Sequence, residues 1–481
     1  MKILLASSEV HPYSKTGGLA DMVGALAKAL ANAGHQVGLI TPLYAGVRER
    51  LPDLRRLEIP LDVPLGSRRL AGDVWSLEPR DGLTIYFVEQ TEFFLRRGLY
   101  QEGSVDYPDN AERFIFFSKA VVQLARRLPW EPDWVHVHDW QVGLVPLLIQ
   151  HEKLATGWGT APRTCLTIHN LAFQGVFPAA QYALTNLPSD YFNPNTAEFY
   201  GQLNCLKAGI ACADSITTVS PRYAREITTM EFGCGLDGLL RHRQRALVGI
   251  LNGVDYDEWN TTQNPYLKHP YSADDLRGKV ANKLELQREL GLPVSETIPL
   301  FGNVTRLADQ KGVDIQLAAL AEMLGSEMQF VLLGSGAPVF EQAYRDLAAR
   351  YPTKAAVRIG YDQAMSHRIE AGCDFFLMPS RFEPCGLNQM YSLRYGTVPI
   401  VRMTGGLDDT VVDIAEDAEH VDGIKFSEYS SRVLARAIRK ALVLYGEPDL
   451  LHQYRVNGMR ADFSWERIAR EYAEVYQRFS R

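Results

Sequence analysis

Cysteine is scarce in this chain, and the few thiols are not spaced as a zinc site or a redox pair would require. Six cysteines occur among 481 residues, and no two of them form a C-x-x-C pair. So few thiols in so long a chain are typical of a reduced, cytoplasmic protein rather than a disulfide-bonded secreted one. We therefore expect free cysteines.

Long apolar runs and an excess of positive charge are also absent. No run of about 18 apolar residues occurs, and no charged leader precedes the first apolar segment, so we expect neither a membrane span nor a signal peptide. The net charge of −7 means that nucleic acid or an anionic membrane would bind against the overall field. A neutral polymer meets no such obstacle. The hydrophobic content of 46% is ordinary for a soluble globular protein, and the length fits two domains.

A glycine loop follows the first apolar run. Lys2 to Ala6 has strand length, and after it come Lys15, Gly17 and Gly18, an amphipathic helix and a second strand at 36–40. This order is half of a doubly wound nucleotide-binding layer. Adjacent glycines permit close backbone approach, and a helix N-terminus attracts anions, so the loop indicates a phosphate or diphosphate site. A plain connecting turn is the alternative, but this loop is longer than most such connections.

Polar residues follow two further strands of the first half. Strands are expected at 74–77, 84–88, 133–138, 163–168 and 215–219, with a helix over 110–128. His136 and His138 alternate on one strand and share a face, but a zinc site would need further ligands that the sequence does not offer nearby. His138, Asp139 and Trp140, and later His169, instead fall where open parallel sheets bind their ligands.

The pattern of strands and helices starts again after a turn near residue 250. Strands are expected at 300–305, 329–333, 357–359, 375–378 and 398–401, with helices between them, which predicts a second doubly wound domain. Arg306 and Lys311 stand where its first strand gives way to a helix, and two cations there favour a diphosphate clamp over simple solvation. Glu383 lies in a Pro-bounded loop, and Cys385 has no neighbouring histidine to activate it as a nucleophile.

Three segments resemble the bacterial glycogen synthases and plant starch synthases, retaining glucosyltransferases that use ADP-glucose. They are Ser14 to Asp21, Arg306 to Gly312 and Pro379 to Met390, and the likeness extends from residue 5 to about 470. It implies a GT-B fold: two Rossmann-like α/β domains facing across a deep cleft. The implied divisions are 1–250, 251–458 and a helix at 459–481 that crosses back to the first domain.

The resemblance also implies a reaction and its participants. Glucose would pass from ADP-glucose to the non-reducing end of an α-1,4-glucan with retention of configuration. No cofactor or metal, no nucleic acid and no membrane would take part, and a homo-oligomer is possible. The location would be the bacterial cytoplasm, or the plastid stroma for a processed plant form.

Site roles come from the same resemblance. Catalytic roles fall to Arg306, Lys311, His169, Glu383 and Asp139. Binding of ADP-glucose falls to Lys15, Gly17, Gly18, Asp21, Asn252, Tyr361, Cys385, Gly386, Leu387 and Thr410. Contacts to the acceptor sugar fall to Trp140 and Tyr100. Tyr361 corresponds to a position that packs on the nucleotide base, although a surface tyrosine explains it nearly as well. Asn388 departs from the threonine that many members carry, which puts its side-chain contact in question.

Two other functions remain open at this point. The chain could be another GT-B glycosyltransferase, such as a sucrose synthase with UDP-glucose as donor, or a glucan-binding protein without activity. The Lys15 to Leu19 signature speaks against the first, and the presence of Arg306, Lys311 and Glu383 speaks against the second. Donor base, primer length and oligomeric state are not determined by the sequence.

Overall fold

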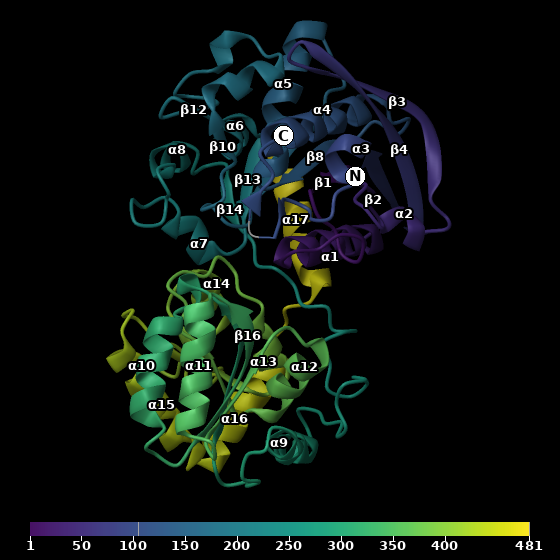
Figure 1. Cartoon of the computed structure of the whole chain (residues 1–481). Helices are drawn as coiled ribbons and strands as arrows, with labels where there is room; N and C mark the ends of the chain where they lie inside the picture. The colour runs from purple at the N-terminus through teal and green to yellow at the C-terminus, as the bar shows by residue number, and fades with distance from the viewer. Residues whose placement is uncertain (104, 481) are drawn as a thin grey trace. The chain divides into compact units, whose positions relative to one another are not determined.

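The computed structural model describes residues 1–103 and 105–480 and divides into two compact units. Unit 1 comprises Met1–Gly253 and Trp465–Arg481, and unit 2 comprises Val254–Ser464. Each unit is built on one large sheet with helices packed against it (Figure 1). None of the described helices has the length and apolar character that a membrane crossing needs.

The large sheet of unit 1 has nine strands among the described residues, in the order β14-β13-β9-β8-β1-β2-β5-β4-β3. Seven run parallel: β1 (Lys2–Ala6), β2 (Gln36–Pro42), β5 (Leu83–Glu89), β8 (Trp134–His138), β9 (Arg163–Ile168), β13 (Ser215–Thr218) and β14 (Leu247–Gly249). At one edge an antiparallel hairpin, β3 (Arg55–Leu65) and β4 (Arg68–Arg80), extends the sheet. β1 lies between β2 and β8, so the loops after β1, β8 and β9 meet at one sheet edge.

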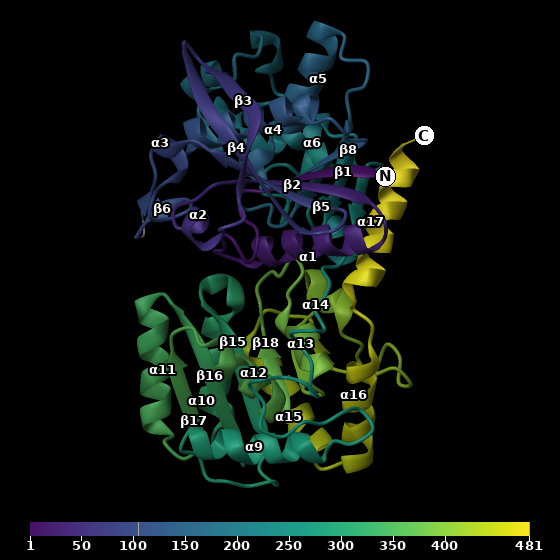
Figure 2. The ribbon, with the colours of Figure 1, turned by 90° about the vertical axis from the view of Figure 1, so that its right-hand side faces the viewer.

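Helices of unit 1 cover the sheet with the stripes that their spacing predicts. They include α1 (Gly18–Asn32), α4 (Asn110–Arg127), α5 (Val145–Thr156), α6 (Cys205–Cys212), α7 (Pro221–Glu226), α8 (Asp237–His242) and α17 (Trp465–Phe479). On α1, Val23, Leu26 and Leu30 are fully buried. The final helix α17 crosses α1 (Figure 2) and buries Ile468 and Tyr472. Burying such apolar side chains is worth about 1.5–3 kcal/mol each.

Short or irregular strands are the elements that sequence periodicity did not predict. The strand expected at 74–77 is the middle of a 13-residue strand, β4, whose partner β3 carries a register shift between Leu57 and Leu61. A second small sheet joins β10 (Val176–Pro178), β12 (Gln202–Asn204) and β11 (Glu198–Phe199). Strands of two or three residues are too short to show a period of two.

Unit 2 has an all-parallel sheet of six strands within the described residues, in the order β17-β16-β15-β18-β19-β20. The strands are β15 (Leu300–Leu307), β16 (Gln329–Gly336), β17 (Ala355–Ile359), β18 (Phe375–Met378), β19 (Val398–Arg402) and β20 (Ile424–Phe426). The helices include α9 (Arg277–Glu289), α10 (Val313–Met323), α11 (Pro338–Arg350), α12 (Gln363–Gly372), α13 (Asn388–Arg394), α14 (Gly405–Thr410), α15 (Ser431–Tyr445) and α16 (Pro448–Arg460).

Alternate strand residues of unit 2 serve two separate cores. On β18, Phe375 and Leu377 pack with residues of α10, α11 and α15. Phe376 and Met378 point the other way and pack with residues of α9 and α12. Both faces of the sheet are therefore covered, which explains why its strands read as continuous apolar runs.

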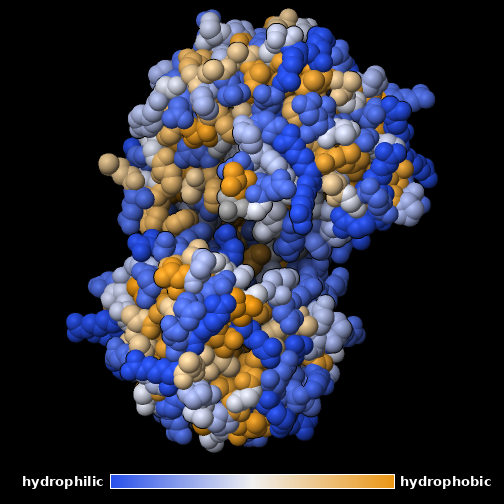
Figure 3. All heavy atoms as spheres, in the orientation of Figure 1, coloured by the Kyte–Doolittle hydropathy of each residue, from blue (hydrophilic) through white to orange (hydrophobic). Residues whose placement is uncertain are grey.

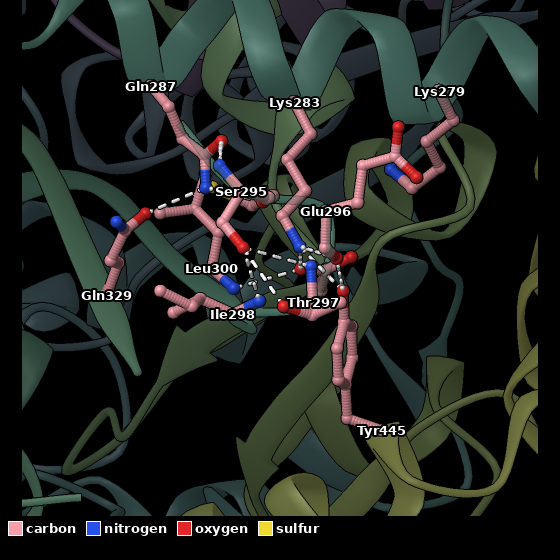
Figure 4. Close-up of polar contacts among 12 residues, drawn as sticks. Lys279, Lys283, Gln287, Ser295, Glu296, Thr297, Ile298, Leu300, Gln329 and Tyr445 are labelled. Atoms are coloured by element: carbon pink, nitrogen blue, oxygen red, sulfur yellow. Dashed lines mark hydrogen bonds and ion pairs between the residues drawn. The ribbon is translucent and has the colours of Figure 1, made fainter. Parts of the chain in front are cut away.

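Helix α9 is tied to the start of the sheet by a buried polar network (Figure 4). The Nζ of Lys283 lies 2.7 Å from a carboxylate oxygen of Asp374 and donates to the carbonyl of Glu296 and to the hydroxyl of Tyr445. Gln287 donates to the Ser295 carbonyl and accepts from the Ser295 N–H. Buried charge is tolerated here because it is paired and fully hydrogen-bonded.

The surface is polar over most of the visible face, with apolar side chains in small separate groups (Figure 3). Large hydrophobic side chains that are more than 80% exposed among the described residues include Tyr200, Met230 and Tyr361. Isolated exposures of this kind are normal on a globular protein. Hydrophobic burial is accordingly concentrated in the cores of the two units.

Candidate functional site

The glycine loop of unit 1, residues 15–18, leads directly into α1. The Nζ of Lys15 lies 2.7 Å from a carboxylate oxygen of Asp21, and the two side chains are 43% and 35% exposed. A surface pair of this kind contributes only about 0–1 kcal/mol. Lys15 can therefore exchange Asp21 for a ligand phosphate at little cost. A Cβ on Gly17 would meet nothing within 4 Å, so the loop leaves open space beside its backbone.

A buried glutamate organises this loop, and sequence reasoning missed it. Glu9 is 4% exposed. Its carboxylate accepts hydrogen bonds from the Thr16 N–H at 2.5 Å, the Thr16 hydroxyl at 2.8 Å and the Gly17 N–H at 3.3 Å. The hydroxyl of Tyr100 donates to the same carboxylate at 2.8 Å and contacts the Ser8 hydroxyl at 2.6 Å. Four donors therefore hold one buried charge.

These hydrogen bonds to Glu9 reduce the number of loop groups that can bind a phosphate. The sequence predicts that a phosphate is bound by the backbone at the adjacent glycines, the helix N-terminus and Lys15. In the structure, the N–H groups of Thr16 and Gly17 donate to Glu9 instead. Lys15, Gly18 and the first turn of α1 are what this segment presents to an anion.

Asp139 has a strained backbone at the end of β8. Its φ is +63°, in a region that favours glycine, and holding a non-glycine residue there costs about 1–3 kcal/mol. Its carboxylate accepts the His169 N–H at 2.7 Å. Burial raises the pKa of Asp139 to about 7, against the backbone donors of His169 and Asn170, which lower it. Strain and a shifted pKa at a sheet edge are features of functional sites.

The imidazoles of unit 1 form a row beside Asp139. The rings of His136 and His138 lie 4.3 Å apart, and those of His138 and His169 lie 5.3 Å apart. Burial lowers the pKa of His136 and of His169 to about 3 and depresses the pKa of His138 strongly. The three rings are therefore neutral at physiological pH. Within the described ranges, no group of three or more His, Cys, Asp or Glu side chains is arranged to hold a metal.

Three other predicted residues of unit 1 have defined surroundings. The Trp140 ring packs edge-on against Phe114 at 5.1 Å and Phe177 at 5.6 Å. Tyr100 packs on the same Phe114 ring at 5.8 Å. Asn252 is buried, and its Oδ1 has no hydrogen-bond partner among the described residues. An orphaned buried acceptor of this kind is unusual in a folded protein.

In unit 2 the predicted cations differ in their partners. The Nζ of Lys311 lies 2.6 Å from a carboxylate oxygen of Glu383, with side-chain exposures of 19% and 7%. The Ser380 hydroxyl donates to the same oxygen at 3.0 Å. Arg306, at the end of β15, is exposed, and its guanidinium has no ion-pair partner in the part of the chain that the structure describes. Arg306 is thus available to a ligand, whereas Lys311 already neutralises Glu383.

The loop after β15, which holds Lys311, and the loop after β18, which holds Glu383, approach each other closely through their backbones. The Arg381 N–H donates to the Gln310 carbonyl at 2.8 Å. Gly312 has a φ of +70°, and a Cβ there would lie 2.0 Å from the Pro379 carbonyl oxygen. A side chain at this position is excluded both by strain and by space. The glycine therefore fixes Lys311 beside Glu383.

The start of α13 is built around Gln389. Its Nε2 donates to the carbonyls of Cys385 and Gly386 and to the Thr410 hydroxyl, at 3.0–3.1 Å. Gly386 has a φ of +73°, and a Cβ there would lie 2.5 Å from the Gln389 Oε1. Leu387 caps the helix, and Cys385 is 4% exposed. These contacts bring Cys385, Gly386, Leu387 and Thr410 to one place in unit 2.

Two predictions for unit 2 receive specific answers. The side chain of Asn388 donates to the Val304 carbonyl at 2.5 Å, so the residue that departs from the family pattern ties α13 to β15. Tyr361 follows β17, is 81% exposed and is thus a surface side chain in this structure. Its proposed contact with a base stays a prediction.

Two family models match the chain in sequence. The one described as starch synthase catalytic domain matches residues 2–242, and the one described as glycosyl transferases group 1 matches residues 283–458. A glycogen synthase of Anaeromyxobacter sp. (strain Fw109-5) is 49% identical over 478 residues, covering 99% of both chains. A glycogen synthase of Opitutus terrae is 46% identical over 478 residues, also covering 99% of both.

Solved structures resemble the chain along its whole length. The catalytic domain of starch synthase IV from Arabidopsis thaliana, bound to ADP and acarbose, has a TM-score of 0.89 at 34% identity and covers 100% of this chain and 99% of its own. Sucrose-phosphate synthase from Thermosynechococcus elongatus has a TM-score of 0.60 at 18% identity and covers 99% of this chain and 98% of its own. At that identity the likeness is one of fold alone. The predicted fold class, two Rossmann-like α/β domains of the GT-B type, is confirmed.

Proposed function

Since the chain belongs to the family of glycogen synthases and starch synthases, we propose that its donor is ADP-glucose and its acceptor is the non-reducing end of an α-1,4-glucan. The chain is a glucosyltransferase. The donor is supported by the ADP bound to the starch synthase structure that the chain resembles.

The observation that carries the proposal is the asymmetric cation pair of unit 2. Arg306 is exposed and has no ion-pair partner among the described residues, while Lys311 is held against Glu383. Arg306 binds the departing diphosphate with its planar fork, and Lys311 shares its charge between the diphosphate and Glu383. Charge that develops on the leaving group is thereby stabilised in a site that is already organised.

We propose that the reaction retains configuration, as the resemblance to retaining glucosyltransferases implies. Retaining glycosidases use two carboxylates about 5 Å apart, one of them as nucleophile. In unit 2, Glu383 is committed to Lys311 and Ser380, which suits a role in binding sugar hydroxyls better than attack on C1. We infer separation of charge, with the diphosphate leaving from the face that the acceptor then enters. In unit 1, His169 and Asp139 are the residues that we propose to contact the transferred sugar.

Remaining members of the predicted site bind rather than react. Lys15 anchors donor phosphate, Asn252 offers its unpaired Oδ1 to a ligand donor, and Trp140 and Tyr100 contact the acceptor sugar. The cations do the work of a metal on the leaving group, so activity needs neither a metal nor a cofactor. It should persist unchanged in EDTA. Because glycogen synthases of bacteria match 99% of the chain, we place the reaction in the bacterial cytoplasm.

A donor screen tests the proposal. Purified protein is incubated with maltoheptaose and either ADP-glucose or UDP-glucose, and elongated products are separated by chromatography. Elongation that is faster with ADP-glucose is expected. Transfer from UDP-glucose alone would support the alternative of a different GT-B enzyme. Glucan binding without elongation from either donor would support a non-catalytic protein.

A further inference from the structure

Three histidine side chains of unit 1 lie in a row because of strand geometry. His136 and His138 alternate on β8 and share a face. β9 pairs with β8 in parallel register, with His138 opposite Thr167, so the residue just after β9 falls beside His138. That residue is His169. The row ends at the site described above, and its buried end contacts α17 through Tyr476.

One hydrogen bond joins the last two rings of this row. The Nδ1 of His138 lies 3.1 Å from the Nε2 of His169. The His138 imidazole is buried, that of His169 is partly buried, and both are neutral, so each carries a single proton on one of its two nitrogens. Either His138 donates from Nδ1 and His169 accepts at Nε2, or the reverse holds. These two arrangements leave His169 as different tautomers, and they present different groups to a ligand.

The second ring nitrogen of His138, Nε2, distinguishes between these two proton arrangements. Its Nε2 is buried and has no hydrogen-bond partner among the described residues. If His169 were the donor, His138 would carry its proton on Nε2, as a buried N–H without an acceptor. If His138 is the donor, its Nε2 is an unpaired acceptor, which proteins tolerate more readily than an orphaned N–H.

We infer that His138 holds its proton on Nδ1, donates it to the Nε2 of His169 and so fixes His169 as the tautomer protonated on Nδ1. His138 is a positioning residue, and His169 meets the sugar with an Nδ1–H donor of set orientation. The tautomer is a property of the fold. Its effect on catalysis rests on the role proposed above for His169.

The other end of the row holds His138 in place. Both nitrogens of His136 are bonded, Nδ1 to the Tyr476 hydroxyl at 2.7 Å and Nε2 to the Thr167 hydroxyl at 2.6 Å. The Thr167 hydroxyl in turn contacts the Thr217 hydroxyl at 2.5 Å. A ring fixed at both nitrogens cannot rotate, and the His138 ring packs on it at an interplanar angle of 33°. The orientation of His169 is thus supported from α17.

Tautomers can be read directly from the full-length protein labelled with ¹⁵N-histidine. Long-range ¹H–¹⁵N spectra distinguish a protonated ring nitrogen from an unprotonated one, and the signals of His169 are assigned by their loss in His169→Gln. A protonated Nδ1 and an unprotonated Nε2 in His169 are expected. The opposite pattern would overturn the inference, whether or not the protein transfers glucose.

Two variants of matched polarity test the positioning role. In His138→Asn the amide nitrogen takes the place of Nδ1 and keeps the donor, whereas in His138→Gln it takes the place of Nε2 and loses it. Loss of the partly buried hydrogen bond to His169 should lower kcat about tenfold in His138→Gln, with KM for both substrates unchanged. His138→Asn should retain kcat near the wild-type value and keep His169 protonated on Nδ1.

The outcomes separate this inference from the proposed function. Equal kcat in His138→Asn and His138→Gln, with near-UV circular dichroism showing both folded, would refute the positioning role. A shift of the His169 proton to Nε2 in His138→Asp, where the partner can only accept, would support it. If His169→Gln retains full activity, and His169 in the wild-type protein is protonated on Nδ1 as expected, the proposed role of His169 fails and the tautomer assignment stands.

Discussion

Removing Arg306 or Lys311 should slow the reaction strongly, but only the removal of Lys311 should weaken the fold. In Lys311→Met, Glu383 keeps its buried position, at 7% side-chain exposure, and loses the ammonium 2.6 Å away. Deleting one partner of a buried ion pair costs about 3–5 kcal/mol, and the partial exposure of Lys311 puts the expected loss near the lower end. Arg306→Met removes an exposed side chain and should change the free energy of unfolding by less than about 0.5 kcal/mol.

Activity should behave differently from stability. Each cation stabilises charge that forms on the leaving group, and loss of one such donor lowers kcat by about a hundred- to a thousandfold. The double variant Lys311→Met with Glu383→Gln removes the uncompensated charge. It should recover most of the lost stability and none of the activity.

The measurements are urea unfolding by far-UV circular dichroism, hydrogen exchange of the peptide spanning 375–395, and steady-state kinetics at saturating glucan. Faster exchange of that peptide in Lys311→Met alone localises the loss to the loop of Glu383. If Lys311→Met is as stable as wild type, Glu383 is not held by its charge. Wild-type kcat in Arg306→Met would refute the diphosphate clamp.

Three further changes concern unit 1. Glu9→Gln replaces a carboxylate that accepts four hydrogen bonds with an amide that cannot accept them all, so KM for ADP-glucose should rise several-fold. The assay varies ADP-glucose at saturating glucan, and an unchanged KM would show that Glu9 does not support the loop. Lys15→Gln should raise the same KM and leave kcat nearly unchanged, because the exposed lysine contributes equally to ground and transition states, and Lys15→Arg should restore it only partly. Burial raises the pKa of Asp139 from 3.8 to about 7, so the folded chain binds this proton more tightly than the unfolded chain, and the resulting stability is complete below pH 3.8 and lost as pH rises through 7. The stability of Asp139→Asn relative to wild type should therefore rise between about pH 4 and pH 8, as measured by urea unfolding at a series of pH values. A difference in unfolding free energy that stays constant over this range would contradict the prediction.

Hydrophobic periodicity predicted the elements that carry both sheets. β9 and β18 have the bounds that the sequence indicated, and α17 (Trp465–Phe479) lies within the 459–481 segment expected to be helical, because apolar stretches with a clear period depend little on context. The hairpin β3–β4 was not predicted at its true length. Its pairing and its register shift are tertiary properties that no short window contains.

The sequence identified the candidate site residues by their type and position in the chain. It did not identify the residues with which their side chains interact. Lys311 and Glu383 were both named from the sequence, yet the ion pair between them joins residues 72 positions apart. Glu9 was missed because a glutamate in a loop ordinarily indicates a solvated side chain. The signal was available only in the fold, where the Thr16 and Gly17 N–H groups converge on its buried carboxylate.

The most direct test of the central claim follows one glucose unit from donor to acceptor. ADP-[1-¹³C]glucose and maltoheptaose are incubated with wild-type protein and with Arg306→Met, and the labelled carbon is followed by ¹³C NMR. Wild type should convert the donor signal into that of a new α-1,4-linked residue at the non-reducing end, and Arg306→Met should do so at least about a hundredfold more slowly. A β-linked product, release of free glucose without transfer, or equal rates in the two proteins would contradict the account.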